Sequence, residues 1–196
     1  LSRLAWKGDL LEVRKTIVDL SSAYRFLYPR QVVLLSCTDK TGKTNIITLA
    51  WSMPASIDPP MLIVGIGPKR YSHELIEETE EFVVNVPTME ILRETLFCGR
   101  RTGREYNKFE ETGLTPLPAK TVKPAIIKEC VSHLECRLHQ QITIGDHTLF
   151  VGEVLVAYAD NEAFDERYNL QKVKLIYHMG GDDFLTISPK IVSPSI

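Results

Sequence analysis

The chain has 196 residues, which suits one domain with a substantial hydrophobic core, and we expect a single domain over residues 1–196. Its formal net charge of -2 gives no overall positive charge for binding nucleic acid or an anionic membrane. Four cysteines, the lack of an apolar run of about 20 residues and the lack of a signal-peptide pattern favour a cytoplasmic protein with reduced thiols.

The N-terminal region predicts an arm followed by a short helix. Residues 1–19 alternate charged residues with leucine and valine, a pattern that fits either an extended arm or a short strand and the start of a helix. Ser21 or Ser22 then begins a short helical segment, and Pro29 ends it because proline cannot continue a helix. We expect this helix to have a structural role, as a plug over one end of a barrel.

Two apolar segments then predict a β-hairpin. Residues 31–37 (QVVLLSC) and 44–50 (TNIITLA) are rich in residues that favour strands, and the DKTGK between them has the composition of a turn. The second strand runs into a polar, turn-like segment, which ends at Asp58-Pro59-Pro60.

Hydroxyls, an indole and a thioether stand together where this second strand ends. They belong to Thr48, Trp51, Ser52, Met53 and Ser56. These groups should lie beside the start of the next strand. They would suit a flat, partly apolar ring system with several hydrogen-bonding edges.

A short basic turn follows the next strand. Residues 61–67 (MLIVGIG) form an apolar run between prolines and predict a buried strand. Lys69, Arg70, Tyr71 and Ser72 come next, and Ser72 is a plausible N-cap for the helical pattern after it. A helix N-terminus carries unsatisfied amide hydrogens and partial positive charge. The segment therefore predicts either an anion site, most often for phosphate, or an ordinary capped surface helix.

A further strand and a second basic segment come after this helix. Residues 82–87 (FVVNVP) predict a strand in which Asn85 needs partners, supplied either by neighbouring backbone or by a ligand. Thr88 caps the next predicted helix, MEILRETLFC. Four cations then occur within nine residues: Arg100, Arg101, Arg104 and Lys108. A charge run is usually a solvated face, but beside the Lys69-Arg70 turn it suggests one anionic ligand held from two sides.

The C-terminal half looks like a set of strands. Residues 114–124 contain three prolines and predict a linker within the domain. Residues 141–160 predict a hairpin that turns at Gly145-Asp146. Residues 174–188 predict two short strands around Met179-Gly180-Gly181, where glycine permits positive φ.

One set of residues has the look of a zinc site. Cys130, His133, Cys136 and His139 recur every three residues, but the apolar positions around them alternate as in a strand. The cysteines would then face one side and the histidines the other, so the four cannot converge on one tetrahedral metal. We expect core cysteines, exposed histidines and no metal site.

Several of these motifs resemble the flavin reductase-like family, which includes the flavoredoxins. The resemblance is carried by TLAWSMPASIDPP, GIGPKRYSHELIEETEEFVVNVP and GDHTLFVGEV, and it extends from about residue 19 to about residue 188. It implies an all-β fold, an antiparallel Greek-key split β-barrel with a few short helices that binds FMN. It also implies a homodimer with FMN near the subunit interface.

The resemblance assigns roles to individual residues. It implies that the FMN phosphate is held by Lys69, Arg70, Tyr71 and Ser72. The ring is assigned to Thr48, Ala50, Trp51 and Met53, and the cofactor-binding set is completed by Ser52, Asn85 and Lys108. In the second basic segment, Asn107 replaces the family's usual acid before Lys108, and Arg101 stands where small residues are common.

Three histidine and carboxylate positions are assigned less directly. In related flavin reductases a loop with histidine and glycine lies close to the flavin and the nicotinamide, which makes His178 the candidate catalytic residue. His147 and Glu153 are either internal polar anchors of the barrel or neighbours of the flavin, and we favour the structural role.

The expected function is that of an FMN-binding oxidoreductase. By resemblance, NAD(P)H or a reduced carrier protein would reduce FMN, which would pass electrons to free flavin, a ferric complex or a partner protein. A non-enzymatic FMN-binding electron carrier or flavin storage protein is the alternative. A third possibility is another planar anion in the barrel, because related split barrels hold pyridoxal phosphate or heme.

Overall fold

The computed structural model describes residues 17–193. The predicted N-terminal arm falls on residues 1–19, most of which lie outside the described residues. The strands are β1 (Arg30–Gln31), β2 (Val33–Thr38), β3 (Thr44–Leu49), β4 (Ser52–Ser56), β5 (Met61–Ile66), β6 (Glu81–Val86), β7 (Pro116–Leu117), β8 (Ile126–Ile127), β9 (Ser132–Ile144), β10 (His147–Ala159), β11 (Tyr177–Gly180) and β12 (Asp183–Leu185). The helices are η1 (Leu20–Leu27), α1 (Tyr71–Thr79), η2 (Met89–Ile91), α2 (Leu92–Arg100) and α3 (Lys108–Thr112).

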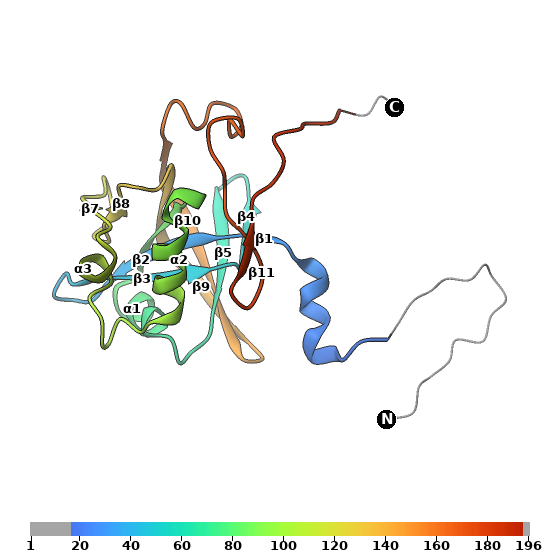
Figure 1. Cartoon of the computed structure of the whole chain (residues 1–196). Helices are drawn as coiled ribbons and strands as arrows, with labels where there is room; N and C mark the ends of the chain where they lie inside the picture. The colour runs from blue at the N-terminus through green and yellow to red at the C-terminus, as the bar shows by residue number, and fades with distance from the viewer. Residues whose placement is uncertain (1–16, 194–196) are drawn as a thin grey trace.

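Seven antiparallel strands form the main sheet, in the order β3-β2-β6-β9-β10-β5-β4. The two strands at the ends of this order, β3 and β4, are consecutive in the chain and are joined by only Ala50 and Trp51. The sheet therefore curls back on itself, and its two edges meet at this corner (Figure 1). This seam between β3 and β4 makes the fold the predicted antiparallel split barrel with a few short helices.

The side chains on both faces of strand β2 are buried. Leu35 packs into the main cluster inside the barrel, whereas its neighbour Leu34 packs into a second cluster outside the barrel. The outer cluster forms because α2, α3 and residues 114–130 cover this face with Cys98, Phe109 and other apolar side chains. Each fully buried leucine contributes about 1.5–3 kcal/mol to folding, so the covering layer stabilises the barrel wall.

The predicted hairpins are confirmed. β2 pairs with β3 from Val33 opposite Leu49 to Thr38 opposite Thr44. β9 and β10 turn at Gly145, which has a φ of 57°, a value that favours glycine. β11 and β12 turn around Gly180 and Gly181, whose φ values are 116° and 59°. β11 also pairs with β1, which places the β11–β12 hairpin beside the first strand of the chain.

The helix η1 does not plug the barrel, so that prediction is wrong. None of its residues is buried, Phe26 keeps 72% of its surface exposed, and the helix stands clear of the sheet (Figure 1). Its cap also differs from the prediction, because the Asp19 side chain accepts a hydrogen bond from the Ser21 amide at 2.8 Å. Residues 52–56, predicted as a turn-like segment, form the edge strand β4 instead, since they pair with β5.

The zinc-like residues are separated by the fold. Cys136 lies in the cluster inside the barrel, whereas Cys130 precedes β9 and lies in the outer cluster. The prediction that the two cysteines face one side is therefore wrong, because the strand alternation does not extend back to Cys130. His139 is exposed as predicted, but His133 is buried, and its Nδ1 lies 2.8 Å from Asn85 Oδ1. The layer at residues 119–127 covers this part of the outer face.

Candidate functional site

A pocket of about 260 Å³ lies over the seam where β3 and β4 meet. We call it the seam pocket. Its floor is the corner from Ile47 to Trp51, its walls are α2 and the end of β5, and its rim includes the β11–β12 hairpin. Aromatic rings surround its mouth: the Trp51 and His147 rings lie 4.4 Å apart, and the Tyr28 and His178 rings 5.4 Å apart. The pocket is therefore shaped for a flat, partly apolar group.

The wall formed by α2 lies unusually close to β3. Thr48 Oγ1 donates a hydrogen bond to the Thr95 carbonyl oxygen at 2.5 Å. A Cβ atom on residue 99 would stand 3.1 Å from Thr48 Cβ, so Gly99 permits this approach. The Thr95 hydroxyl oxygen is buried in the wall and has no hydrogen-bond partner among residues 17–193. A buried polar atom of this kind usually has a partner, which a ligand in the pocket can supply.

A smaller pocket of about 60 Å³ adjoins the seam pocket and shares Ile47, Arg70 and Gly99 with it. We call it the basic pocket. One side is the turn into α1, which supplies Lys69, Arg70, Tyr71 and Ser72, and the other is the loop after α2 together with Lys108. The two basic segments that the sequence singled out therefore meet at one cavity. Among the described residues that line it, none is acidic.

The helix α1 begins at Tyr71, with Arg70 in the cap position and no side-chain cap. The prediction that Ser72 caps the helix is wrong: Ser72 lies in the first turn, buried, and its Oγ accepts a hydrogen bond from Asn45 Nδ2 at 2.8 Å. The His73 amide donates a hydrogen bond to the Arg70 carbonyl oxygen at 3.0 Å. The amides that precede it at the helix start have no partner within the helix, and this end carries partial positive charge. Their position beside Lys69 makes the basic pocket suited to an anion.

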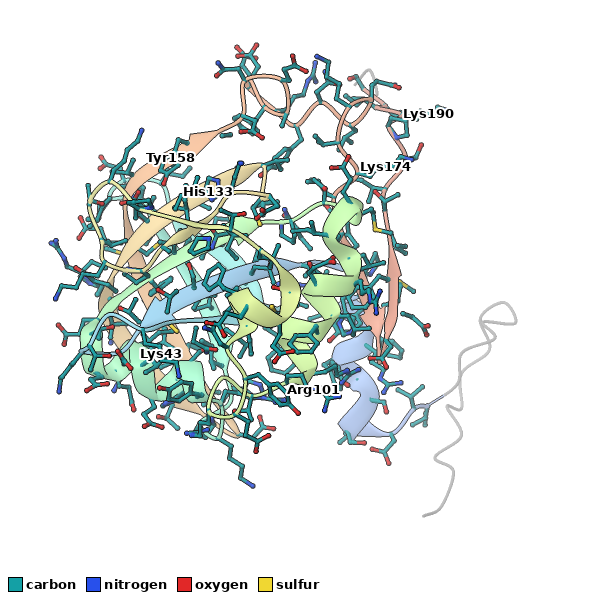
Figure 2. The ribbon with its side chains drawn as sticks, turned by 60° about the vertical axis from the view of Figure 1, so that its left-hand side comes forward. Lys43, Arg101, His133, Tyr158, Lys174 and Lys190 are labelled. Atoms are coloured by element: carbon teal, nitrogen blue, oxygen red, sulfur yellow. The ribbon has the colours of Figure 1, made fainter. Side chains whose placement is uncertain are left out.

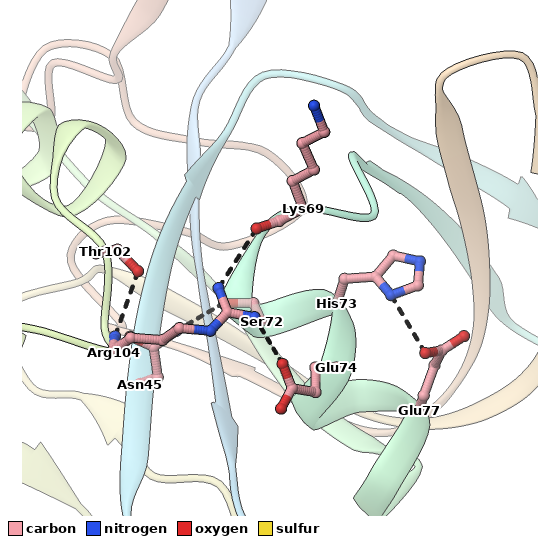
Figure 3. A network of polar contacts seen from close by, with 8 residues as sticks. All are labelled: Asn45, Lys69, Ser72, His73, Glu74, Glu77, Thr102 and Arg104. Carbon is pink, nitrogen blue, oxygen red and sulfur yellow. Dashed lines mark hydrogen bonds and ion pairs between the residues drawn. The ribbon is translucent and has the colours of Figure 1, made fainter.

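The loop after α2 is held against α1 by Arg104 (Figure 3). Its guanidinium pairs with Glu74 at 2.6 Å and donates a hydrogen bond to the Lys69 carbonyl oxygen at 3.4 Å. This places Gly103 directly on Asn45, and a Cβ atom on residue 103 would clash with Asn45 Oδ1. That oxygen is itself buried without a partner in the part of the chain described here. Each pocket is thus lined by one residue with a buried polar atom that has no partner among the described residues.

Lys108 provides a buried positive charge at the basic pocket. It is only 4% exposed, and its Nζ donates hydrogen bonds to the carbonyl oxygens of Ile46 at 2.6 Å and Cys98 at 2.7 Å. Burial lowers its pKa to about 8, because an ammonium loses hydration there. Near pH 7 the side chain is still mostly charged.

Of the four cations of the second basic segment, two line the basic pocket and two pair with separate acidic residues. Arg101 and Lys108 line the basic pocket. Arg104 is paired with Glu74, as described above. Arg100 lines the seam pocket, where its Nε donates to Asp182 Oδ1 at 2.7 Å and its Nη2 donates to the Gly181 carbonyl oxygen at 2.9 Å. Arg100 therefore ties α2 to the β11–β12 hairpin across the pocket mouth.

Most of the predicted site residues lie at these pockets. Those at the seam pocket are Thr48, Ala50, Trp51, Arg70 and His178, and those at the basic pocket are Lys69, Arg70, Tyr71, Ser72 and Lys108.

Ser52, Met53 and Asn85 do not line either pocket. β4 carries Ser52 and Met53 along the sheet edge, and 52% of Met53 is exposed. Asn85 is fully buried elsewhere: its Nδ2 donates to the Leu34 carbonyl oxygen at 3.1 Å, and its Oδ1 accepts from the Ile127 amide at 3.1 Å. Its partners are therefore protein groups, and its role is structural.

A separate polar cluster lies on the outer face of β9 and β10. Figure 2 shows His133 and Tyr158 together, well away from Arg101 at the basic pocket, and their rings are 5.2 Å apart. Glu135 is fully buried there, and its carboxylate accepts hydrogen bonds from the amides of Lys120 at 2.7 Å and Thr121 at 2.6 Å. This cluster holds the covering layer to the barrel.

Sequence reasoning assigned no binding role to several residues that line the pockets, among them Asn45, Thr95 and Gly103. His147 was expected to be a structural anchor, but it lines the seam pocket and its Nδ1 lies 2.8 Å from Asp146 Oδ1. Its place directly after the hairpin turn was the signal available. Asn45 was a polar residue in an apolar strand, which is the same signal that pointed to Asn85.

The comparisons with known proteins agree with this geometry. The family model of the flavin reductase like domain matches residues 24–185. An uncharacterized protein of Archaeoglobus fulgidus is 40% identical over 171 residues, which cover 86% of this chain and 94% of that protein. Flavoredoxin from Methanosarcina acetivorans is 27% identical, with a TM-score of 0.82 over 92% of this chain and 95% of that one. The FMN-binding protein from Thermus thermophilus has the same fold, with a TM-score of 0.81 at 22% identity over 94% of this chain and all (100%) of that one.

Proposed function

Because the chain belongs to the flavin reductase-like family, we propose that it is an FMN-binding oxidoreductase of the flavin reductase or flavoredoxin type. The observation that carries this proposal is the adjacency of two cavities of different character. The seam pocket has an aromatic mouth and a partly apolar floor, and it shares Ile47, Arg70 and Gly99 with the basic pocket at the N-terminus of α1. A flavin ring and a phosphate need these two environments side by side.

The residues present fit FMN chemically. Thr95 lines the seam pocket and Asn45 lines the basic pocket, and within residues 17–193 each has a buried side-chain oxygen without a partner, to which a bound ligand would be a neighbour. The first-turn amides of α1 and the Lys69 and Arg70 side chains supply donors for a phosphate. Gly99 permits the close approach of α2 to Thr48, and Gly103 permits that of the loop after α2 to Asn45.

We assign the ring to the corner at Thr48, Ala50 and Trp51. The phosphate is assigned to Lys69, Arg70, Tyr71 and Ser72, with Lys108 behind them. Bound FMN would supply the electron chemistry, and the protein would orient the ring and exclude water from it. No side chain has to act as an acid or base, because electron or hydride arrival at the ring depends on positioning. His147 and His178 stand at the mouth, where a second substrate would enter.

The electron donor is proposed to be NAD(P)H or a reduced carrier protein, and the acceptor a free flavin, a ferric complex or a partner protein. The relative from Methanosarcina acetivorans is a flavoredoxin, which supports a role in electron transfer. The four cysteines are free and buried, which suits a reducing compartment, and we place the protein in the cytoplasm. Among the described residues, no helix has the length and apolar character needed to span a membrane.

A homodimer is also proposed. η1 keeps Leu20, Phe26 and Leu27 largely exposed, and such a contiguous apolar face usually marks a contact surface. Tyr24 of the same helix lies 5.9 Å from Trp51, ring to ring, so this face borders the mouth of the seam pocket. A second copy bound to η1 would therefore lie next to the site.

The purified protein tests the function directly. Bound flavin predicts absorption bands at roughly 375 and 450 nm, whereas a Soret band or no uptake of FMN would contradict the assignment. Steady-state oxidation of NADH and NADPH is then followed with FMN, riboflavin or ferric citrate as acceptor. Turnover above the free-flavin background supports an oxidoreductase. FMN binding without such turnover, with any donor, would instead identify a carrier or storage protein.

A further inference from the structure

We propose that Lys108 takes up a proton from solvent when FMN binds, so that the affinity of the basic pocket for the phosphate depends on pH in the alkaline range. This inference rests on the proposed function, since it requires the FMN phosphate to occupy the basic pocket. It goes beyond that function because it assigns to Lys108 a change of protonation state, in place of a fixed positive charge.

The position of Lys108 allows it to respond to a ligand. Lys108 is the first residue of α3, and its Nζ is fixed between β3 and α2 by the Ile46 and Cys98 carbonyl oxygens. An ammonium has three hydrogens to donate, and these two bonds use two of them. Because Lys108 also lines the basic pocket, the third is available to an anion there.

Among the described residues that line the basic pocket, no acidic side chain compensates the charge of Lys108. The ionisable groups around it are Cys37 in β2, Cys98 in α2, and Lys69, Arg70, Tyr71 and Arg101 of the basic pocket, while β3 contributes the Ile46 carbonyl oxygen and no ionisable side chain. Burial raises the pKa of the Cys37 thiol to about 12 and that of the Cys98 thiol to about 11, so both thiols are neutral near pH 8. The positive charge of Arg70 lowers the pKa of Lys108 further, in addition to the effect of burial, whereas an anion would raise it.

Lys108 without a ligand is therefore half neutral near pH 8. A phosphate monoester has a second pKa of about 6, so FMN brings close to two negative charges into the basic pocket at this pH. An opposite charge within about 4–6 Å favours the protonated form of a lysine, and the pKa of Lys108 rises on binding. The site then takes up a proton that was absent from the free protein.

Thermodynamic linkage between proton binding and FMN binding gives the direction of the pH effect on affinity and the pH range in which it occurs. Well below pH 8 Lys108 is protonated in both states, so binding transfers no proton to it. Between the pKa of the free protein and the raised pKa of the complex, up to one proton enters per FMN. In that range the affinity for FMN falls as pH rises, by at most about tenfold per pH unit.

Calorimetric titration in two buffers with different heats of ionisation measures this proton directly. At about pH 9 we expect FMN binding to take up roughly 0.5–1 proton, and at about pH 7 little or none. Riboflavin has the same ring without the phosphate, so it should bind with no uptake at either pH. The measurement needs only the wild-type protein, which makes it independent of any variant.

Two variants assign the proton to Lys108. Lys108→Arg keeps a positive charge that stays protonated throughout, so FMN should bind without proton uptake at about pH 9. Lys108→Met fills the same space without a charge and should also abolish the uptake, with weaker binding. Arg93→Met removes an exposed cation of α2 that lines neither pocket, and it should retain the uptake.

Two results would overturn the proposal. One is FMN binding to the wild type at about pH 9 with no more proton uptake than riboflavin shows. The other is undiminished uptake in both Lys108 variants, which would place the proton on another group. Failure of FMN and riboflavin alike to bind would contradict the proposed function itself, and the inference would fall with it.

Discussion

The carboxamide oxygen of Asn45 lies directly against Gly103, so closely that a Cβ atom on residue 103 would clash with it. The contact joins β3 to the loop after α2 at the wall of the basic pocket. The absence of a side chain at residue 103 is thus a condition for the two basic segments to meet.

Gly103→Ala should weaken FMN binding by displacing either Asn45 or the loop. Forcing a methyl group into a packed contact costs about 1–3 kcal/mol, so the FMN dissociation constant should rise roughly 5- to 150-fold. Calorimetric titration measures this change, and a thermal melt shows whether the loss is confined to the site. An unchanged affinity for FMN would mean that the loop is free to move away from Asn45 at no cost.

Arg70→Ala should remove a charge-assisted hydrogen bond to the phosphate. Such bonds are worth about 1.5–3 kcal/mol, so FMN affinity should fall by roughly 10- to 150-fold, while the weaker binding of riboflavin changes little. Arg93→Ala, which removes an exposed arginine of α2 outside both pockets, is the matched control. Equal losses for FMN and riboflavin would show that Arg70 supports the ring or the fold instead of the phosphate.

Glu135→Gln should destabilise the covering layer of the barrel. Burial alone would raise the pKa of Glu135, but the hydrogen bonds from the Lys120 and Thr121 amides outweigh it and hold the pKa below its usual value. Weakening these bonds should lower the free energy of unfolding by about 1–3 kcal/mol at neutral pH, as measured by urea denaturation. The exposed Glu90→Gln is the control, and it should change stability little.

The lowered pKa of Glu135 predicts how the stability difference between the wild type and Glu135→Gln depends on pH. A lowered pKa in the folded state contributes stability that is complete above the unfolded pKa of about 4.3 and is lost as pH falls through the folded pKa. The gap between wild type and Glu135→Gln should therefore shrink as the solution is acidified below about pH 5. A gap that stays constant over this range would show that Glu135 is not ionised in the folded protein.

Phe26→Glu should disrupt the proposed dimer, because it places a charge in the middle of the exposed apolar face of η1. Light scattering coupled to gel filtration should then give the mass of one chain, against two for the wild type. Leu117→Glu, which adds the same charge to β7 on another surface, is the control. A monomeric wild-type protein, or a Phe26→Glu variant that remains a dimer, would contradict the use of η1.

Local signals were sufficient for the strands and for the basic turn. The hairpins β2–β3 and β9–β10 follow from apolar runs on either side of turn residues, and both are where the sequence places them. The cations of the Lys69–Ser72 turn and the start of a helix are neighbours in the chain, so a local signal pointed to an anion, and this role stays a prediction. The meeting of this turn with the Arg101–Lys108 segment was expected from charge and is observed at the basic pocket.

The predictions that were wrong share a physical cause, which is packing between segments that are distant in the sequence. Asn85 and Asn45 are equivalent in sequence, each a polar residue in an apolar strand. Asn85 faces the layer that includes Ile127, whereas Asn45 faces the loop at Gly103, and no local pattern distinguishes these environments. The burial of His133 and the exposure of η1 depend likewise on which segments cover each surface. Sequence periodicity gives the face on which a side chain lies, but not what lies opposite it.

The floor and the rim of the seam pocket are tied to the fold in different ways. The corner at Ala50 and Trp51 is where the barrel turns from its last strand to its first, so its shape is tied to the architecture of the sheet. The β11–β12 hairpin lies outside that sheet and is fastened at the pocket mouth by the exposed pair Arg100 and Asp182. Insertions or substitutions in the hairpin can therefore change the shape of the pocket mouth without changing the shape of the corner.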